Sequence, residues 1–404
     1  MIKYLKKLGP GLLFAGSAVG VSHLVQSTKA GANFGFGLIW ALVLINIIKF
    51  PFFEFGPRYA AATGENLLEG YKKLGKVFLK VYLVLSFATM FTIQAAVTIV
   101  TAGIASSLFK NSLNIQSWTL IILFFCLLIL IFGKFKFLDK FMKIIIIILS
   151  FSTIIAVVNA FFNLDYDTNW TQVFPSSNQD IIFLIAFMGW MPAPLDVSIW
   201  QSIWVIEKQK SSSDFKKNSI MQDFNIGYIG TFLLAIGFLF LGSLVMFGTD
   251  TKLSNNGSIF SLQLIQMYSK NLGDWSYFLI GIAAFTTMFS TTLTTLDASP
   301  RVMNKSIELI SEKKIKNGYN YWIIILISGT IFIFFFYLSE MGSLIKIATI
   351  LSFLTAPIYA IMNYLLIFSK HTPKNFRPSR FMNFLSITGI LFLIVFNIWY
   401  LSIL

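Results

Sequence analysis

Eleven apolar stretches constrain this chain more than any other feature, because each is long enough to cross a lipid bilayer as a helix. The hydrocarbon core is about 30 Å thick, so a spanning helix needs roughly 20 mostly apolar residues. The stretches run approximately over residues 10–30, 35–62, 77–108, 116–133, 138–162, 181–204, 225–248, 275–297, 321–338, 343–369 and 381–404. None alternates polar and apolar residues as membrane β-strands do. The sequence therefore predicts an all-α polytopic membrane protein with about 11 transmembrane helices in a single domain, residues 1–404.

Composition excludes several other classes of protein. Only 12% of the residues are charged and 56% are hydrophobic, whereas soluble domains carry about 25% charged residues. The single cysteine, Cys126, cannot form an intrachain disulfide. Two histidines and the absence of a GxxxxGK[ST] pattern argue against an enzyme, a sensor or a nucleotide-driven pump. We expect no cofactor, no nucleic-acid binding and no obligate protein partner, but contact with the lipid bilayer.

The basic residues predict the orientation of the chain. With the N-terminus inside, 25 of the 31 Lys and Arg residues fall in inner loops and four in outer loops, while Lys49 and Lys346 lie within spans. Inner loops of membrane proteins are enriched in Lys and Arg. We therefore expect a prokaryotic cell membrane protein with a cytoplasmic N-terminus and an outside C-terminus.

Two of the spans are interrupted at mid-membrane. The sixth span contains Pro192 and Pro194, which remove backbone donors. The first span has small and polar residues at its centre, namely Gly16, Ser17, Gly20, Ser22 and His23. Proline kinks and glycine packing would explain either span alone, but broken helices five segments apart are typical of the binding site of an inverted-repeat transporter. The pair predicts unwinding near residues 16–23 and 189–194.

Short motifs along the chain match one transporter family. Gly9-Pro10-Gly11 and Phe34-Gly35 match its first segment, and Met191-Pro192 matches the Met-Pro-His-Asn motif of its sixth. Asn46, Arg58 and Thr63-Gly64 match the end of its second segment. In these residues the chain resembles the Nramp family of divalent-metal transporters. The resemblance implies a LeuT-type fold with inverted repeats of five helices, over about 9–162 and 180–369, plus one further helix, 381–404, and secondary transport by alternating access.

The metal motif of that family is altered here. Its Asp-Pro-Gly-Asn falls on Gly20-Val21-Ser22-His23, so glycine replaces the metal-binding carboxylate. Met191 keeps the position of the methionine ligand, and Ala193 replaces the histidine. Gln94 and Val97 fall where the family carries two acidic residues used in proton transfer.

The altered site favours a small anion over a divalent cation. Mg²⁺ and Mn²⁺ prefer carboxylate, carbonyl and water ligands, whereas the half-helix N-termini that remain carry roughly +0.5 elementary charge each. We expect Ser22 to cap one terminus and Pro192 or Pro194 to occupy the first turn of the other. Bicarbonate is the specific candidate, and nitrate or formate also fits. The predicted substrate site comprises Gly20, Ser22, His23, Met191, Pro192 and Ala193.

The eighth span offers ligands for a coupling ion. Ser290, Thr291 and Thr294 share one face among seven Ser and Thr residues in 286–295. The LeuT-type resemblance implies Na⁺ between these hydroxyls and the unwound first segment at Gly16. The alternative is that the hydroxyls bond to carbonyls of their own helix. Asp196, an intramembrane carboxylate, is a further candidate as Na⁺ ligand or proton relay.

One alternative function and two structural expectations also follow from the sequence. A divalent-metal transporter of altered selectivity would take hydrated Mg²⁺ or Mn²⁺ through Met191, backbone carbonyls and Asp196, with proton coupling. We also expect an ion pair between Asp297 and Arg301. A gate or anchoring network is the third expectation, formed by Glu54, Arg58 and Lys49.

Overall fold

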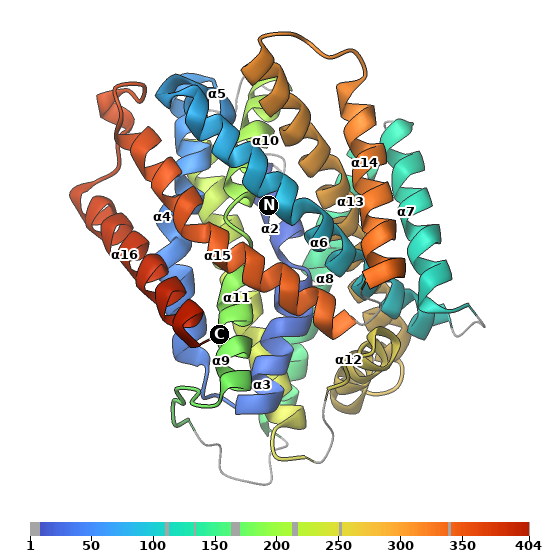
Figure 1. Cartoon of the computed structure of the whole chain (residues 1–404). Coiled ribbons are helices and arrows are strands. Elements are labelled where there is room, and N and C mark those ends of the chain that lie inside the picture. Colours follow the sequence, from blue (N-terminus) through green and yellow to red (C-terminus); the bar gives the residue numbers. More distant parts are fainter. Residues whose placement is uncertain are drawn as a thin grey trace.

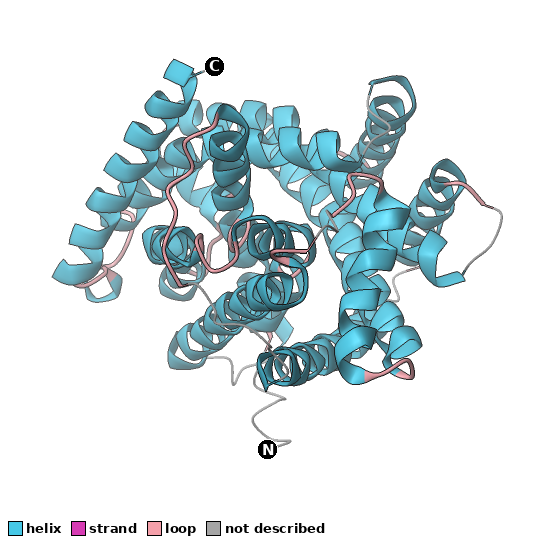
Figure 2. Cartoon of the chain, turned by 90° about the horizontal axis from the view of Figure 1, so that it is seen from below, coloured by secondary structure: helices cyan, strands magenta, loops and turns pink. Residues whose placement is uncertain are grey.

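The computed structural model describes residues 9–109, 113–132, 135–162, 170–211, 217–249, 253–337 and 341–403, and these contain helices but no strand (Figure 2). Met1–Lys7, which contribute to the predicted orientation, lie outside the described residues. The helices are α2 (Pro10–Ala18), η1 (Ser22–Ser27), α3 (Thr28–Phe34), α4 (Ile39–Thr63), α5 (Leu67–Leu74), α6 (Lys76–Phe109), α7 (Ile115–Ile131), α8 (Phe135–Phe162), α9 (Asn178–Trp190), α10 (Val197–Ser211), α11 (Lys217–Met246), α12 (Gly257–Leu272), α13 (Ser276–Ser311), α14 (Gly318–Phe332), η2 (Ile333–Tyr337), α15 (Met341–Phe368), η3 (Lys374–Phe376) and α16 (Arg380–Ile403).

Apart from α5, α12 and η3, these helices correspond to the eleven predicted spans. In the described part of the chain, seven are long and apolar enough to cross a membrane: α4, α6, α11, α13, α14 continued by η2, α15 and α16. The fourth and fifth spans are the shorter apolar helices α7 and 147–162 of α8. The first and sixth spans are each divided, into α2 and η1–α3 and into α9 and α10. The all-α polytopic prediction is confirmed, and the division into two repeats stays a prediction.

The packing separates a buried centre from a lipid-facing rim. In α13, 72% of the apolar window is buried, against 22% in α14. Helices α7 and α16 lie at opposite edges of the bundle (Figure 1) and expose Phe124, Phe125, Phe381 and Val395. Exposing such an apolar rim to water would be unfavourable, whereas contact between the rim and the hydrocarbon of a bilayer is favourable.

Glycines bring the first segment into backbone contact with α11. A Cβ atom at Gly31 would lie 1.9 Å from the carbonyl oxygen of Leu239, and one at Gly11 would lie 2.0 Å from that of Asp223. Small residues of this kind let membrane helices approach closely. The Asp223 carboxylate also accepts hydrogen bonds from the N–H groups of Gly9 (3.0 Å) and Gly11 (2.7 Å). It thereby satisfies donors at the N-terminus of α2 that have no partner within the helix.

Ion pairs lie at helix ends on the predicted inner side of the protein. Asp297 accepts from Arg301 at 2.8 Å, one turn along α13, which confirms the predicted pair. Glu54 and Arg58 also pair within α4. At the end of α13, Glu312 lies 3.3 Å from both Lys72 and Lys76, whose hydrogen bonds and charges hold the pKa of its carboxyl below the usual value.

Candidate functional site

The first segment breaks over three residues. Helix α2 ends at Ala18, Val19 is extended, and a π-helical stretch begins at Ser22 before continuing as α3. The break lies inside the predicted range 16–23 but is shorter. A Cβ atom at Gly20 would lie 2.9 Å from the Thr291 hydroxyl oxygen, so glycine lets the backbone pass directly against α13.

The sixth segment breaks over six residues. Helix α9 ends at Trp190 and α10 begins at Val197, so residues 191–196 form a non-helical link. The predicted break, 189–194, lies two residues too early. Pro192 and Pro194 both belong to this link, where their missing N–H groups need no helical partner. The expectation that either proline occupies the first turn of α10 is therefore wrong.

The two breaks enclose a cavity of about 30 Å³. A single water needs about 10–15 Å³ on the same measure, so the space suits a small ion. Among the described residues, no charged side chain lines the cavity. Its lining comprises Ser17, Ala18, Gly20, Val21, Ser22, Ile93, Val97, Trp190, Ala193, Pro194, Val197, Trp200, Thr291 and Thr295. Gly20, Ser22 and Ala193 stand where the sequence predicts substrate contacts.

Several of these lining residues are not in the predicted substrate site, although the sequence analysis already names Ser17 among the polar residues of the first span. Ser17 lies one turn before Gly20, and Thr295 lies one turn after Thr291 on the same helix. A hydroxyl residue three or four positions from a predicted site residue is the sequence signal that could have assigned both Ser17 and Thr295 to the cavity. Trp190 and Trp200 flank the link and carry no comparable signal.

His23 and Ser22 form a hydrogen-bonded pair beside the cavity. The ring of His23 is fully buried and does not line the cavity. Its Nε2 lies 2.9 Å from the carbonyl oxygen of Thr231, and its Nδ1 lies 2.7 Å from the Ser22 hydroxyl. Because a carbonyl only accepts, Nε2 carries a proton. His23 therefore orients Ser22, and the structure does not place it in direct contact with the substrate space.

Ser22 does not cap the half-helix. Its hydroxyl lies 2.8 Å from the carbonyl oxygen of Ala18, and η1 has no side-chain cap. The predicted capping role is therefore wrong, because the hydroxyl bonds back to the preceding turn. The same hydroxyl oxygen lies 3.4 Å from the carbonyl oxygen of Pro192, so the two breaks are adjacent at Ser22.

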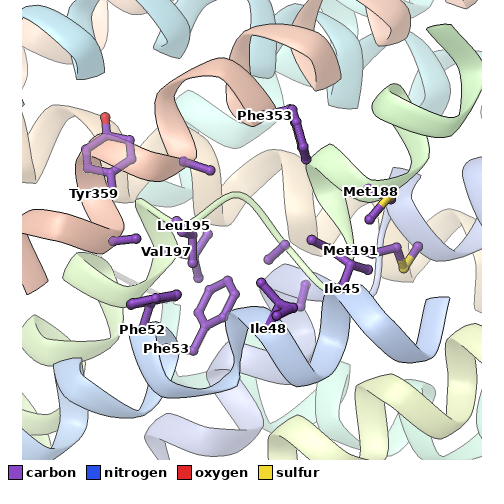
Figure 3. Close-up of a cluster of buried hydrophobic side chains, with 14 of the residues drawn as sticks. Ile45, Ile48, Phe52, Phe53, Met188, Met191, Leu195, Val197, Phe353 and Tyr359 are labelled. Atoms are coloured by element: carbon purple, nitrogen blue, oxygen red, sulfur yellow. The ribbon is translucent and has the colours of Figure 1, made fainter. Parts of the chain in front are cut away.

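Met191 and Pro192 lie at the edge of the site rather than in it. The Met191 side chain is fully buried in the apolar cluster that includes Ile45 and Ile48 of α4 (Figure 3). Its sulfur accepts a 3.9 Å contact from the Ser27 hydroxyl. Neither residue lines the cavity.

Lys49 braces the broken sixth segment. Its side chain is fully buried, and its Nζ donates to the carbonyl oxygens of Met188 (2.9 Å), Gly189 (2.7 Å) and Ala193 (3.5 Å). Three acceptors match the three donors of an ammonium group. The lysine thus satisfies carbonyls at the C-terminus of α9 that have no helical partner.

This contact corrects the expectation that Lys49 joins the pair of Glu54 and Arg58. The ammonium points to the break, whereas that pair is closed within α4. The position of Lys49 within a membrane span was the sequence signal for its role, because charged residues inside a membrane are rare and usually functional.

Oxygen atoms of the first and eighth segments converge at Thr291. Its hydroxyl oxygen lies 3.4 Å from the carbonyl oxygens of both Gly16 and Val19, and 3.2 Å from that of Thr287. The Ser290 hydroxyl is buried and has no partner in the described part of the chain. Thr294 is buried but does not line the cavity. Gly16 and Thr291 are thus brought together as predicted, at the negative end of α2.

Asp196 lies apart from the lining of the cavity. Its carboxylate is buried, and Oδ1 has no hydrogen-bond partner among the described residues. Its electrostatic neighbours are Lys49, Tyr82 and Tyr359. Across the described ranges, no group of three His, Cys, Asp or Glu side chains could hold a metal ion.

Comparison with known proteins identifies the architecture. A crystal structure of a mutant manganese transporter from Eremococcus coleocola matches with a TM-score of 0.71 at 14% identity, covering 96% of this chain and 84% of that one. MhsT in complex with L-phenylalanine matches with a TM-score of 0.66 at 14% identity, covering 98% and 97%. These likenesses confirm the predicted LeuT-type fold.

Sequence comparison identifies the family. An uncharacterized protein of Pasteurella multocida is 34% identical over 403 residues, which are 98% of this chain and 92% of that protein. The family described as natural resistance-associated macrophage protein-like matches residues 11–402. The chain is thus a multi-pass membrane transporter rather than an enzyme, and it belongs to the Nramp family.

Proposed function

We propose that this transporter moves a small inorganic anion by alternating access and couples it to Na⁺, with bicarbonate as the specific candidate. The observation that carries the proposal is the arrangement of four helix ends around the two breaks. The C-termini of α2 and α9 carry partial negative charge, and the N-termini of η1 and α10 carry partial positive charge. Helices η1 and α10 begin at Ser22 and Val197, and both residues line the cavity. Each N-terminus carries roughly +0.5 elementary charge, which favours an anion. At α10 the Asp196 carboxylate lies beside the Val197 N–H and offsets part of this charge, so the N-terminus of η1 is the stronger attraction.

The C-termini of α9 and α2 carry partial negative charge, and each has a different partner. At the end of α9, Lys49 neutralises the carbonyls of Met188 and Gly189. At the end of α2, the carbonyls of Gly16 and Val19 face the Thr291 hydroxyl and offer oxygen ligands to a cation. An anion and a nearby Na⁺ would each reduce the cost of bringing the other into a region of low dielectric.

Cavity size supports a small ion as the substrate. The volume of about 30 Å³ is too small for an amino acid. The hydroxyls of Ser17, Ser22, Thr291 and Thr295 line the cavity. Each bonds to an acceptor within the protein, so each must reorient to donate to an anion. Bicarbonate presents both acceptors and an O–H donor to such groups.

Divalent-metal transport is the alternative, favoured by the family and by its likeness to a protein named as a manganese transporter. Against it, no carboxylate lines the cavity, and neither Met191 nor Asp196 faces it. A desolvated dication there would lack anionic ligands. We therefore predict that Mn²⁺ and Mg²⁺ bind weakly or not at all in isothermal titration of the purified protein. Micromolar Mn²⁺ affinity would reverse the order of the two functions.

The proposed coupling is tested by bicarbonate uptake into proteoliposomes at fixed pH, with Na⁺ exchanged for K⁺. We expect uptake to require Na⁺. Thr291→Val should raise the Na⁺ concentration for half-maximal uptake about tenfold, which corresponds to roughly 1.4 kcal/mol, because valine keeps the shape but supplies no oxygen. Thr287→Val is the matched control, since the Thr287 hydroxyl bonds only to Ala283 of its own helix. Equal Na⁺ dependence in both variants would reject the Thr291 site, and uptake in K⁺ alone would leave Asp196 as the coupling candidate.

The proposed setting is a prokaryotic plasma membrane with the N-terminus in the cytoplasm. The 25 Lys and Arg residues in the predicted inner loops, against four in the outer loops, support this orientation. The substrate ion, Na⁺ and the bilayer are then the only partners that the proposed mechanism needs.

A further inference from the structure

A second and larger cavity lies between η1–α3, α9 and α15, with a volume of about 380 Å³. The end of the first span and the beginnings of the sixth and tenth spans meet here. All three lie on the side that the proposed orientation places outside the cell. The lining comprises Val25, Gln26, Lys29, Gln179, Ile182, Phe183, Ala186, Asn255, Gly342, Ser343, Ile345 and Lys346. We call this space the outer vestibule.

In the described part of the chain, the charged residues that line the outer vestibule are two lysines, the half-buried Lys29 and the exposed Lys346. The Nζ of Lys29 donates to the Asn255 side-chain oxygen at 2.9 Å and lies 5.7 Å from the centre of the Phe260 ring. Neither Lys29 nor Lys346 forms a salt bridge with any described residue. The closest acidic residue along α9, Asp180, bonds to Ser177 and does not line the space.

Among the described residues, the ammonium group of Lys29 has only neutral partners, so its charge is not compensated there. Lys29 is half-buried, so part of its hydration is lost and an anion is the partner that restores the balance. Clefts lined by charge of one sign concentrate ligands of the opposite sign and raise their association rates. A divalent cation would be repelled from the same surface.

The outer vestibule also extends toward the breaks. Val25 and Gln26 belong to η1, and the next residue, Ser27, contacts Met191 at the first position of the sixth-segment link. Ala186 lies about one turn before the end of α9. An ion in the outer vestibule would therefore lie on the outer side of both breaks.

We propose that the outer vestibule is a capture site for a small inorganic anion, held by Lys29 and Lys346 before it reaches the cavity between the breaks. This inference rests on the proposed function and adds a second anion site to it. The amides of Gln26, Gln179 and Asn255 supply neutral donors around the two ammonium groups.

The test compares Lys29→Gln, Lys346→Gln and the double variant with wild type in two measurements. These are bicarbonate binding to the purified protein and bicarbonate uptake by proteoliposomes, at low salt and at about 1 M salt, where charges are screened within about 3 Å. We expect the double variant to raise KM for uptake about tenfold at low salt, with kcat unchanged. At high salt the difference should shrink. Lys270→Gln, an exposed lysine of α12 outside the vestibule, is the matched control, and Lys29→Arg should keep the wild-type KM.

The outcomes separate this inference from the proposed function. Uptake with an unchanged KM and unchanged binding in the double variant would overturn the capture site. Binding that depends on the two lysines, without uptake by wild type, would keep the capture site and overturn the proposed function. Neither binding nor uptake would overturn both.

Discussion

Lys49→Met is expected to lower the free energy of unfolding by at least about 3 kcal/mol, because hydrogen bonds to a charged group contribute roughly 1.5–3 kcal/mol each. The variant leaves the carbonyl oxygens of Met188 and Gly189 without donors at a depth where water cannot replace them. Chemical denaturation in detergent micelles measures the change. Transport should be lost as well, since the link that carries Ala193 is no longer held.

The matched control for this experiment is Lys270→Met. Lys270 is exposed on α12, so the same change of side chain should alter stability by no more than about 0.5 kcal/mol. Similar free energies for the Lys49 and Lys270 variants would show that Lys49 does not brace the break.

Gly31→Ala should prevent α3 from packing on α11 and should greatly reduce the yield of folded protein. The new Cβ would lie 1.9 Å from the carbonyl oxygen of Leu239 and 2.7 Å from the backbone nitrogen of Ser243. Neither atom belongs to a flexible side chain, so the two helices must separate. The loss should exceed the range of about 1–3 kcal/mol that is typical of overpacked cores. Size-exclusion chromatography and thermal denaturation of the purified protein measure the effect.

A second glycine on the same helix pair provides the control. Gly230 of α11 is exposed, and a Cβ there would meet nothing within 4 Å. Gly230→Ala should therefore be neutral or stabilising by up to about 1 kcal/mol, because alanine favours the helix. A folded Gly31→Ala protein with wild-type stability would contradict the close helix contact.

The fold could be predicted because its signals are local. Each span is a run of apolar residues of bilayer length, and Pro192 and Pro194 mark a break by removing donors. The boundaries were less accurate. The sixth-segment break begins at Met191 rather than at residue 189, because Gly189 remains in the last turn of α9, where Lys49 binds its carbonyl oxygen.

The directions of the site side chains could not be predicted in the same way. Matching a motif assigns His23 and Met191 to a position in the chain, but the direction of each side chain depends on the surrounding helices. His23 lies in a π-helical stretch and bonds to Thr231, which is 208 residues away. Met191 turns into the apolar cluster against α4. Both outcomes depend on long-range packing that no local pattern encodes.

The acceptors of Lys49 are main-chain carbonyls, and this has a consequence for how such a protein can diversify. A contact with the backbone does not depend on the side chains at residues 188, 189 and 193. The side chain at 193, which lines the cavity, is therefore free to vary over generations while the architecture of the broken helix is inherited intact. Selectivity and scaffold can evolve separately, and directed evolution of new ion preferences should begin at Ala193.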